Sequence, residues 1–85
     1  MQYCKQFQSV DEFIDCIRRG GEVEFIYREK AYSVTHHADS IFVIEACNES
    51  SEKQFSTPRG ALEYQLEDRK LKDVLLDLDI TFRTF

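Results

Sequence analysis

The stretch EVEFIYREKAYSVTHHADSIFVIEAC, which runs from Glu22 to Cys47, decides the fold. Apolar and polar residues alternate over positions 23–28 and again over 32–35, with a polar bend at Glu29-Lys30 between them. Alternation with a period of two places every second side chain on the same face of a strand. The stretch therefore predicts a β-hairpin with one buried face.

A third strand is expected directly after this hairpin. The chain turns at Ala38-Asp39-Ser40 and continues as IFVIEAC, over positions 41–47, which is apolar on both faces. Ile26 interrupts the polar side of the first strand in the same way. We expect the third strand to be central or covered, and the second face of the sheet to be partly covered.

A helix is predicted ahead of the hairpin, from Val10 to Arg19. Ser9 and Glu12 form a capping-box pattern, and the next apolar positions follow the spacing of one helical face. Gly20-Gly21 supplies the stop signal. The acidic first turn and the basic last turn complement the helix dipole.

The remainder of the chain predicts shorter elements. Positions 48–53 read as a polar loop, and Phe55 extends a short strand. Thr57-Pro58 is an N-cap followed by proline, so a second helix begins at Pro58. A third short helix follows over 71–78, and the closing segment DITFRTF alternates as a strand.

Together these elements predict one α+β domain over residues 1–85. We expect a small antiparallel sheet of three or four strands, with the N-terminal helix and two short C-terminal helices packed on one face. The exposure of Tyr3, Phe7, Ile26 and Phe85 decides whether the outer face carries an apolar patch. The expected core consists of Phe13, Ile17, Phe25, Tyr27, Val34, Phe42, Ile44, Leu62, Leu75 and Phe82.

Composition constrains the compartment and the partner. Sixteen Asp and Glu against eleven Lys and Arg give a net charge of −5, which argues against direct binding to DNA or RNA. Cys4, Cys16 and Cys47 are scattered and odd in number, unlike the dense pairs of secreted domains. No apolar run has the length of a membrane span or a secretory signal. We expect a soluble protein of the cytoplasm.

No pattern in the chain predicts a metal, a cofactor or a catalytic group. His36 and His37 are adjacent on a predicted strand, so their imidazoles point to opposite faces and do not share one ion. The three glycines form no phosphate-binding motif. The pair to test for an enzyme is Cys47 with His36 or His37, because a thiol and an imidazole meet in space rather than in sequence.

The functional hypothesis rests on acidic residues. Carboxylates recur through the whole chain, and spread carboxylates can mimic phosphates and occupy a basic groove. An ordinary solvated surface is the alternative explanation of the same charge. The candidate partner-binding residues are Glu45, Glu49, Glu52, Glu63, Glu67 and Asp68.

Two segments, SVDEFIDCIRRGGEVEFIYREKAYSV and TPRGALEYQLEDRKLKDVLLDLDI, carry the pattern and order of elements on which a resemblance rests. It resembles small acidic proteins, mostly uncharacterised, of low-GC Gram-positive bacteria and their phages. In length, charge and α+β character it is also similar to anti-CRISPR inhibitors, which bind an effector nuclease. The resemblance implies a protein partner and carries over no functional residue.

We therefore expect a non-enzymatic small acidic binding protein, of the kind that inhibits a nucleic-acid-processing enzyme as a DNA mimic. Three alternatives stay open: a housekeeping regulatory protein, a toxin-immunity protein, and a small enzyme that uses the Cys/His pair. An uncovered edge strand is a template for pairing, so a homodimer also stays open.

Overall fold

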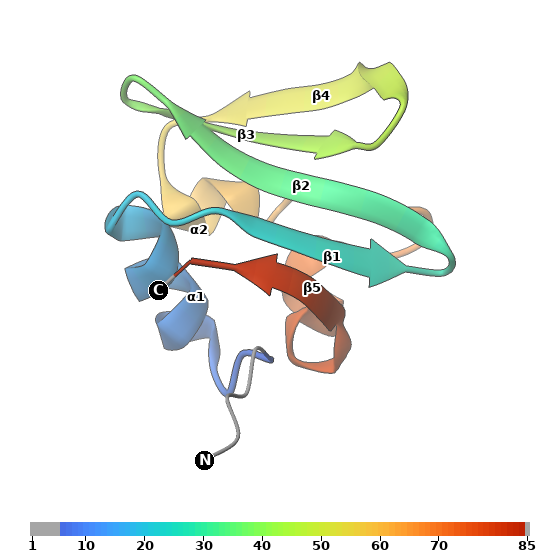
Figure 1. Ribbon diagram of the computed structural model, residues 1–85, viewed down its shortest axis with the longest axis horizontal. Helices are drawn as coiled ribbons and strands as arrows, with labels where there is room; N and C mark the ends of the chain where they lie inside the picture. Colours follow the sequence, from blue (N-terminus) through green and yellow to red (C-terminus); the bar gives the residue numbers. More distant parts are fainter. Residues whose placement is uncertain (1–5, 85) are drawn as a thin grey trace.

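In the computed structural model, which describes residues 6–84, the chain opens with helix α1 (Val10–Arg18), as predicted (Figure 1). The Ser9 hydroxyl caps it by accepting a hydrogen bond of 3.1 Å from the backbone N–H of Glu12. Its apolar face is buried, including Cys16, whose thiol donates a hydrogen bond to the backbone oxygen of Thr84. The turn after the helix closes at Gly20, which has a φ of +84°.

Glu12 joins the start of α1 to the far end of the chain. Its carboxylate accepts a hydrogen bond of 2.6 Å from the backbone N–H of Gln8 and lies 3.2 Å from the Arg83 guanidinium. The hydrogen bond from Gln8 lowers the pKa of Glu12 most, Arg83 lowers it further, and burial opposes both. Because the folded pKa lies below the unfolded one, the ionised form of Glu12 stabilises the fold.

We expect Glu12→Gln to lower the free energy of unfolding by about 0.5–1 kcal/mol at pH 7, since half-exposed ionic contacts are weakened by solvent. The stabilisation is present above the unfolded pKa and is lost as the pH falls through the lowered folded pKa, so the two proteins should converge in acid. Urea unfolding from pH 7 to about pH 3 measures this. Asp11→Asn, in the same turn, is the control and should lower the free energy of unfolding less, because Asp11 forms no ion pair with the described residues.

The sheet contains five antiparallel strands in the order β4-β3-β2-β1-β5. Strands β1 (Val23–Tyr27), β2 (Lys30–His37), β3 (Ser40–Glu45) and β4 (Asn48–Phe55) form a meander. Strand β5 (Asp79–Arg83) returns from the end of the chain and pairs with the free side of β1. The α+β class is confirmed, and the expected count of three or four strands is one too low.

The turn between β1 and β2 lies at Arg28-Glu29, one residue earlier than predicted. Both residues have positive φ values, 52° and 69°, which is the backbone of the two-residue turns that suit the twist of a hairpin. Glycine or asparagine usually fills such positions. Their absence here explains why the sequence placed the turn one residue too late.

Positions 48–53, which were predicted to form a polar loop, belong instead to strand β4. All eight of its residues are half-buried or exposed, and β4 is an edge strand that pairs only with β3 among the described strands. An edge strand of this kind carries no alternating apolar pattern. Gln54 helps to hold it in place by donating a hydrogen bond of 2.6 Å to the Ser40 hydroxyl.

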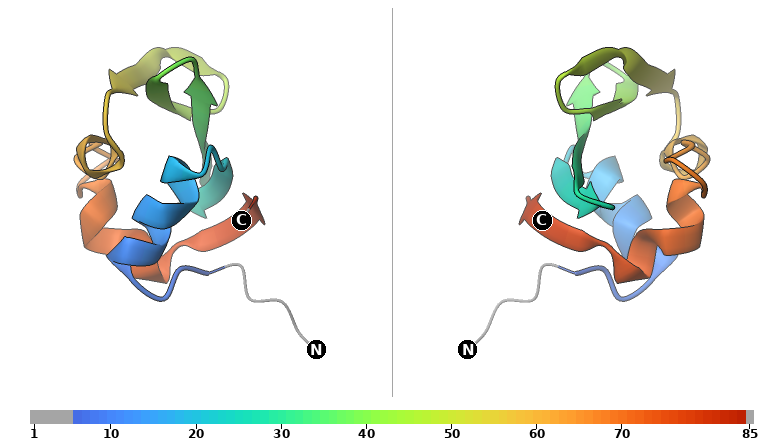
Figure 2. Two further views of the ribbon diagram at one scale, coloured as in Figure 1. Left: turned by 90° about the vertical axis from the view of Figure 1, so that its left-hand side faces the viewer. Right: turned by 90° about the vertical axis from the view of Figure 1, so that its right-hand side faces the viewer.

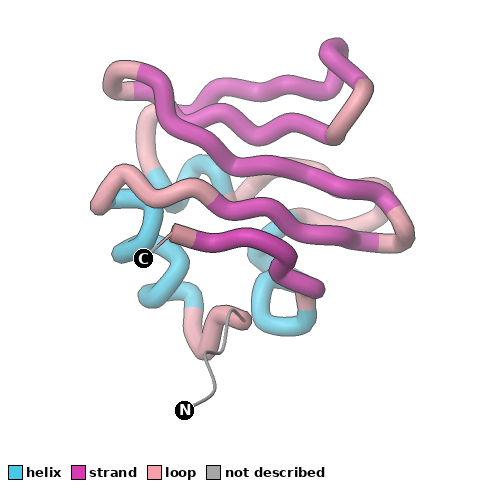
Figure 3. Tube along the Cα trace, in the orientation of Figure 1, coloured by secondary structure: helices cyan, strands magenta, loops and turns pink. Residues whose placement is uncertain are grey.

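Three short helical segments connect β4 to β5. Helix α2 (Pro58–Ala61) begins at the predicted residue, with the Thr57 hydroxyl accepting from the backbone N–H of Gly60. Helix α3 (Leu71–Val74) continues into a 3₁₀ turn, η1 (Leu75–Asp77). All the helical segments lie on one side of the curved sheet (Figure 2 and Figure 3).

The core lies between this helical layer and the concave face of the sheet. Six predicted core residues are buried there, and Tyr27 packs against them while partly exposed. Phe7 is also buried, so it adds no outer patch, whereas Tyr3 and Phe85 lie outside the described residues. The six are Phe13, Ile17, Phe25, Val34, Leu62 and Leu75.

Three predicted core residues, Phe42, Ile44 and Phe82, are on the wrong face. The register pairs Val34 with Val43, so the odd-numbered residues of β3 point toward the helices instead of Phe42 and Ile44. Phe82 is 42% exposed. The expectation that β3 is central or covered is met only by its pairing with β2 and β4, since no described element covers its outer face.

Candidate functional site

The predicted acidic residues of the segment after α2 are engaged in ion pairs. Each of the three carboxylates lies within 3.0 Å of a Lys or Arg side chain. Asp68 also accepts a hydrogen bond of 2.8 Å from the Tyr27 hydroxyl. The pairs are Glu63 with Lys70 and Lys72, Glu67 with Lys30, and Asp68 with Arg28.

The predicted acidic residues of β4 have a different environment. Glu49 and Glu52 are exposed on this edge strand and form no ion pair with any residue of the 6–84 range. Glu45, on the neighbouring strand β3, is half-buried. The negative charge of Glu49 and Glu52 is therefore uncompensated at the surface.

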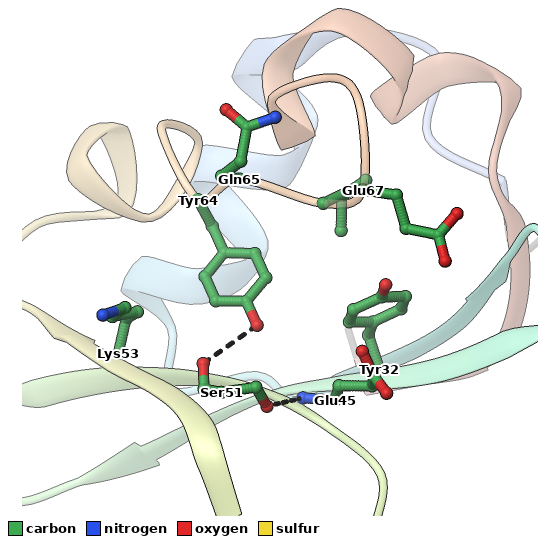
Figure 4. Close-up of a pocket in the computed structure, with 8 residues that line it drawn as sticks. Tyr32, Glu45, Ser51, Lys53, Tyr64, Gln65 and Glu67 are labelled. Carbon is green, nitrogen blue, oxygen red and sulfur yellow. Dashed lines mark hydrogen bonds between the residues drawn. The ribbon is translucent and has the colours of Figure 1, made fainter. Parts of the chain in front are cut away.

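Glu45 and Glu67, which are distant in sequence, line one small pocket between the concave face of the sheet and the segment that follows α2 (Figure 4). We call it the tyrosine pocket, and its volume is about 220 Å³. Tyr32 and Tyr64 meet edge to face across it, with ring centroids 6.3 Å apart. Its other lining residues are Ser51, Lys53, Gln65 and Leu66.

An irregularity in β4 builds one wall of the tyrosine pocket. Glu45 pairs with Asn48 and Val43 with Lys53, so β4 has extra residues opposite β3. Ser51 lies in this bulge, where its hydroxyl accepts from the backbone N–H of Glu45 and donates to the backbone oxygen of Asn48. No sequence pattern predicted the bulge, because serine in a polar segment is unremarkable.

The tyrosine pocket combines hydroxyl donors with carboxylate acceptors. Burial raises the pKa of Tyr32 and of Tyr64, so both phenols stay protonated at neutral pH. The Tyr64 hydroxyl donates a hydrogen bond of 3.0 Å to the backbone oxygen of Ser51. Glu67 accepts from Lys30 at 2.7 Å. The arrangement suits a small polar group, and its volume leaves no room for a large cofactor.

A second hollow, of about 450 Å³, lies where α1 meets α2 and α3. Glu63 and Lys72 form an ion pair of 3.0 Å on its wall. Arg59 and Asp73 complete its charged rim. Two positive and two negative side chains line it, so it favours no ligand of one charge.

The Cys/His pair proposed for an enzyme is not formed. Cys47 lies in the turn after β3, whereas His36 pairs with Ile41 near the other end of that strand. The four steps along the strand from Ile41 to Glu45 span roughly 13 Å. Cys47 is exposed, and the Nε2 atom of His36 is buried with no hydrogen-bond partner among the described residues.

Cys16 belongs to the core rather than to a reactive site. Burial raises the pKa of its thiol, which keeps it protonated and unreactive. Cys4 lies outside the described residues. Within residues 6–84, no group of three His, Cys, Asp or Glu side chains is arranged to hold a metal ion.

Comparisons of the chain with protein-family models, with curated proteins and with solved structures found no match. Over residues 6–84, no helix has the length and apolar character needed to cross a membrane.

Proposed function

We propose that this protein is a non-enzymatic binding protein of the cytoplasm, which uses exposed carboxylates to occupy a basic surface on a protein partner. A nucleic-acid-processing enzyme is the partner class that we favour, because its phosphate-binding groove is basic and attracts an acidic protein. The protein would then act as an inhibitor that competes with DNA or RNA.

The observation that carries this proposal is the surplus of unpaired carboxylates. Five of the sixteen Asp and Glu side chains form ion pairs within residues 6–84. Glu49 and Glu52 are among the unpaired ones, and both are exposed on β4 at the edge of the sheet, within its irregular stretch opposite β3. The backbone of a strand is already ordered, so binding there costs the conformational entropy of the glutamate side chains but little of the backbone.

Carboxylates that form ion pairs within residues 6–84 and carboxylates that form none there should contribute unequally to binding of the partner. Glu63, Glu67 and Asp68 already contact cations, so a partner would have to displace Lys or Arg to reach them. Glu49 and Glu52 require no such displacement. We therefore assign the larger part of the attraction to the β4 pair.

The test is capture of partners by the tagged protein from nuclease-treated bacterial lysate at low salt, followed by elution with duplex DNA. We expect DNA to release a stoichiometric DNA-handling protein, because mimic and DNA compete for one groove. Glu49→Lys/Glu52→Lys should weaken binding of the purified partner at least tenfold. Asp11→Lys/Glu29→Lys makes the same charge change elsewhere and should bind normally.

Two results would contradict the proposal. One is a partner that DNA fails to release, or that binds the β4 variant as well as the parent protein. The other is the absence of any salt-sensitive partner. Urea unfolding of each variant shows whether it is folded before its binding is compared.

A further inference from the structure

The convex face of the sheet is free of described helices (Figure 2). Strand residues alternate between this open face and the helix-covered face. On β1, for example, Val23 and Phe25 are buried, while Glu24 and Ile26 are exposed. The open face is thus a surface of the sheet itself, presented on rigid strands.

Apolar side chains form a bent stripe across the open face, in which Ile44 and Phe82 lie in one cross-strand row and Ile26 and Ala31 in the next. Ile26 on β1 lies directly opposite Ala31 on β2. Ile44 pairs with Ser33 and Phe82 with Glu24, so each lies one diagonal step from that central pair. We call Phe42, Ile44, Ala31, Ile26 and Phe82 the open-face stripe. Ile26 and Phe82 are 38% and 42% exposed, large values for residues of their size.

Every Lys and Arg of the described strands lies on the other face. Lys30 is in register with Tyr27, Lys53 with Val43, and Arg83 with Val23, each of which points toward the helices. Their contacts agree: Lys30 binds Glu67, Lys53 lines the tyrosine pocket, and Arg83 lies over the Phe7 ring. The strands therefore contribute no cation to the open face.

The charges beside the open-face stripe are negative. Glu24 lies between Ser33 and Phe82, and Asp79 is paired with Ile26. Both are exposed and form no ion pair with the described residues. A second copy of the chain, with its own net charge of −5, would bring like charges together on this face.

We propose that the open-face stripe binds a protein segment in which Lys or Arg residues flank apolar side chains. The apolar residues would pack on Ile26 and Phe82, and the cations would pair with Glu24 and Asp79. Apolar anchors surrounded by complementary charge are the usual composition of a protein interface. The inference rests on the proposed function only in taking the partner to be a protein, and it does not require the carboxylates of β4.

The test selects binders from a phage-displayed library of random peptides on the immobilised full chain at low salt. Enriched peptides should combine Lys or Arg with aliphatic or aromatic residues. Ile26→Ser and Phe82→Ser should each weaken a selected peptide at least tenfold. Leu76→Ser is the matched control, because Leu76 is 43% exposed in η1 and lies off the sheet.

The charged part of the interface is tested separately. Glu24→Gln/Asp79→Asn should weaken the peptide and flatten the salt dependence of its binding. Amide signals of β1, β2, β3 and β5 should shift in NMR spectra when the peptide is added. Urea unfolding of each variant confirms that the domain is intact.

Four outcomes would overturn the inference. Selected peptides could lack basic residues, or could bind Ile26→Ser as well as Leu76→Ser. A dimer that forms with concentration and is abolished by Ile26→Ser would make a second copy the occupant. Loss of peptide binding in Glu49→Lys/Glu52→Lys alone would place the peptide on β4, which overturns this inference and leaves the proposed function standing.

Discussion

Replacing Phe25 with alanine should lower the free energy of unfolding by about 3–5 kcal/mol, the cost of emptying a fully buried aromatic site. Phe25 is 1% exposed, and its ring stacks on Tyr32 with centroids 5.3 Å apart. It also pairs with Ile80 of β5. Its removal therefore loosens three neighbouring strands at once.

The size of this effect matters because a domain of 85 residues is stable by only about 4–13 kcal/mol. Urea unfolding followed by circular dichroism would give the loss as a lower midpoint. Ile26→Ala is the matched control, since Ile26 is the next residue along β1 but faces outward. It should cost less than about 1 kcal/mol. Equal losses for the two variants would contradict the register described for β1.

Helix α1 and strand β4 differ in how well sequence predicts them, because their signals differ in range. Helix α1 was predictable since its cap, apolar face and stop all lie within twelve residues of Ser9. Strand β4 was not, because its place depends on pairing with β3 and its own residues are polar. A strand that is held only by a neighbour carries little signal of its own.

The assignment of β3 to the core shows a second limit. Both sets of alternating residues in this strand are apolar, so periodicity alone could not tell which set faces the helices. The register with β2 decides the matter in favour of Ile41 and Val43. The outward set, Phe42 and Ile44, then becomes part of the open-face stripe. What looked like core in the sequence is surface in the fold.

The candidate site was predictable as a set of charges but not as an arrangement. Lys30 pairs with Glu67 and Arg28 with Asp68, and the members of each pair are distant in the chain. Such pairs exist only once the segment after α2 packs against the β1–β2 hairpin. The tyrosine pocket depends on the same packing, together with the bulge at Ser51.

The two faces of the sheet differ in charge, because successive side chains along a strand point to opposite faces. Cations of the strands point to the helical side, where Lys30 and Arg83 meet carboxylates. Glu24 and Asp79, on the opposite face, have no such partners within residues 6–84. Glu24 and Asp79 therefore give the open face a negative charge that no Lys or Arg of the described strands offsets. Both proposals draw on this separation, one through β4 and the other through the open face.

Gly21→Ala should destabilise the protein by about 1–3 kcal/mol or more, because the site has no space for a methyl group. A Cβ atom at Gly21 would lie 2.7 Å from the backbone oxygen of Cys16 and 2.8 Å from that of Thr84. These atoms belong to α1 and to the end of the chain beside β1, so relief requires a shift of backbone. The Cys16 sulfur, also at 2.8 Å, is buried and cannot move away freely.

The adjacent Gly20 provides the control and reverses the ranking expected from sequence. Gly20 has a φ of +84° but no atom within 4 Å of an added Cβ, so Gly20→Ala meets only backbone strain, about 1 kcal/mol. Rules for helix ends single out Gly20 as the essential glycine. The packing instead makes Gly21 the less replaceable one. Urea midpoints of the two variants decide between these views, and a larger loss for Gly20→Ala would show that α1 and Thr84 can move apart at little cost.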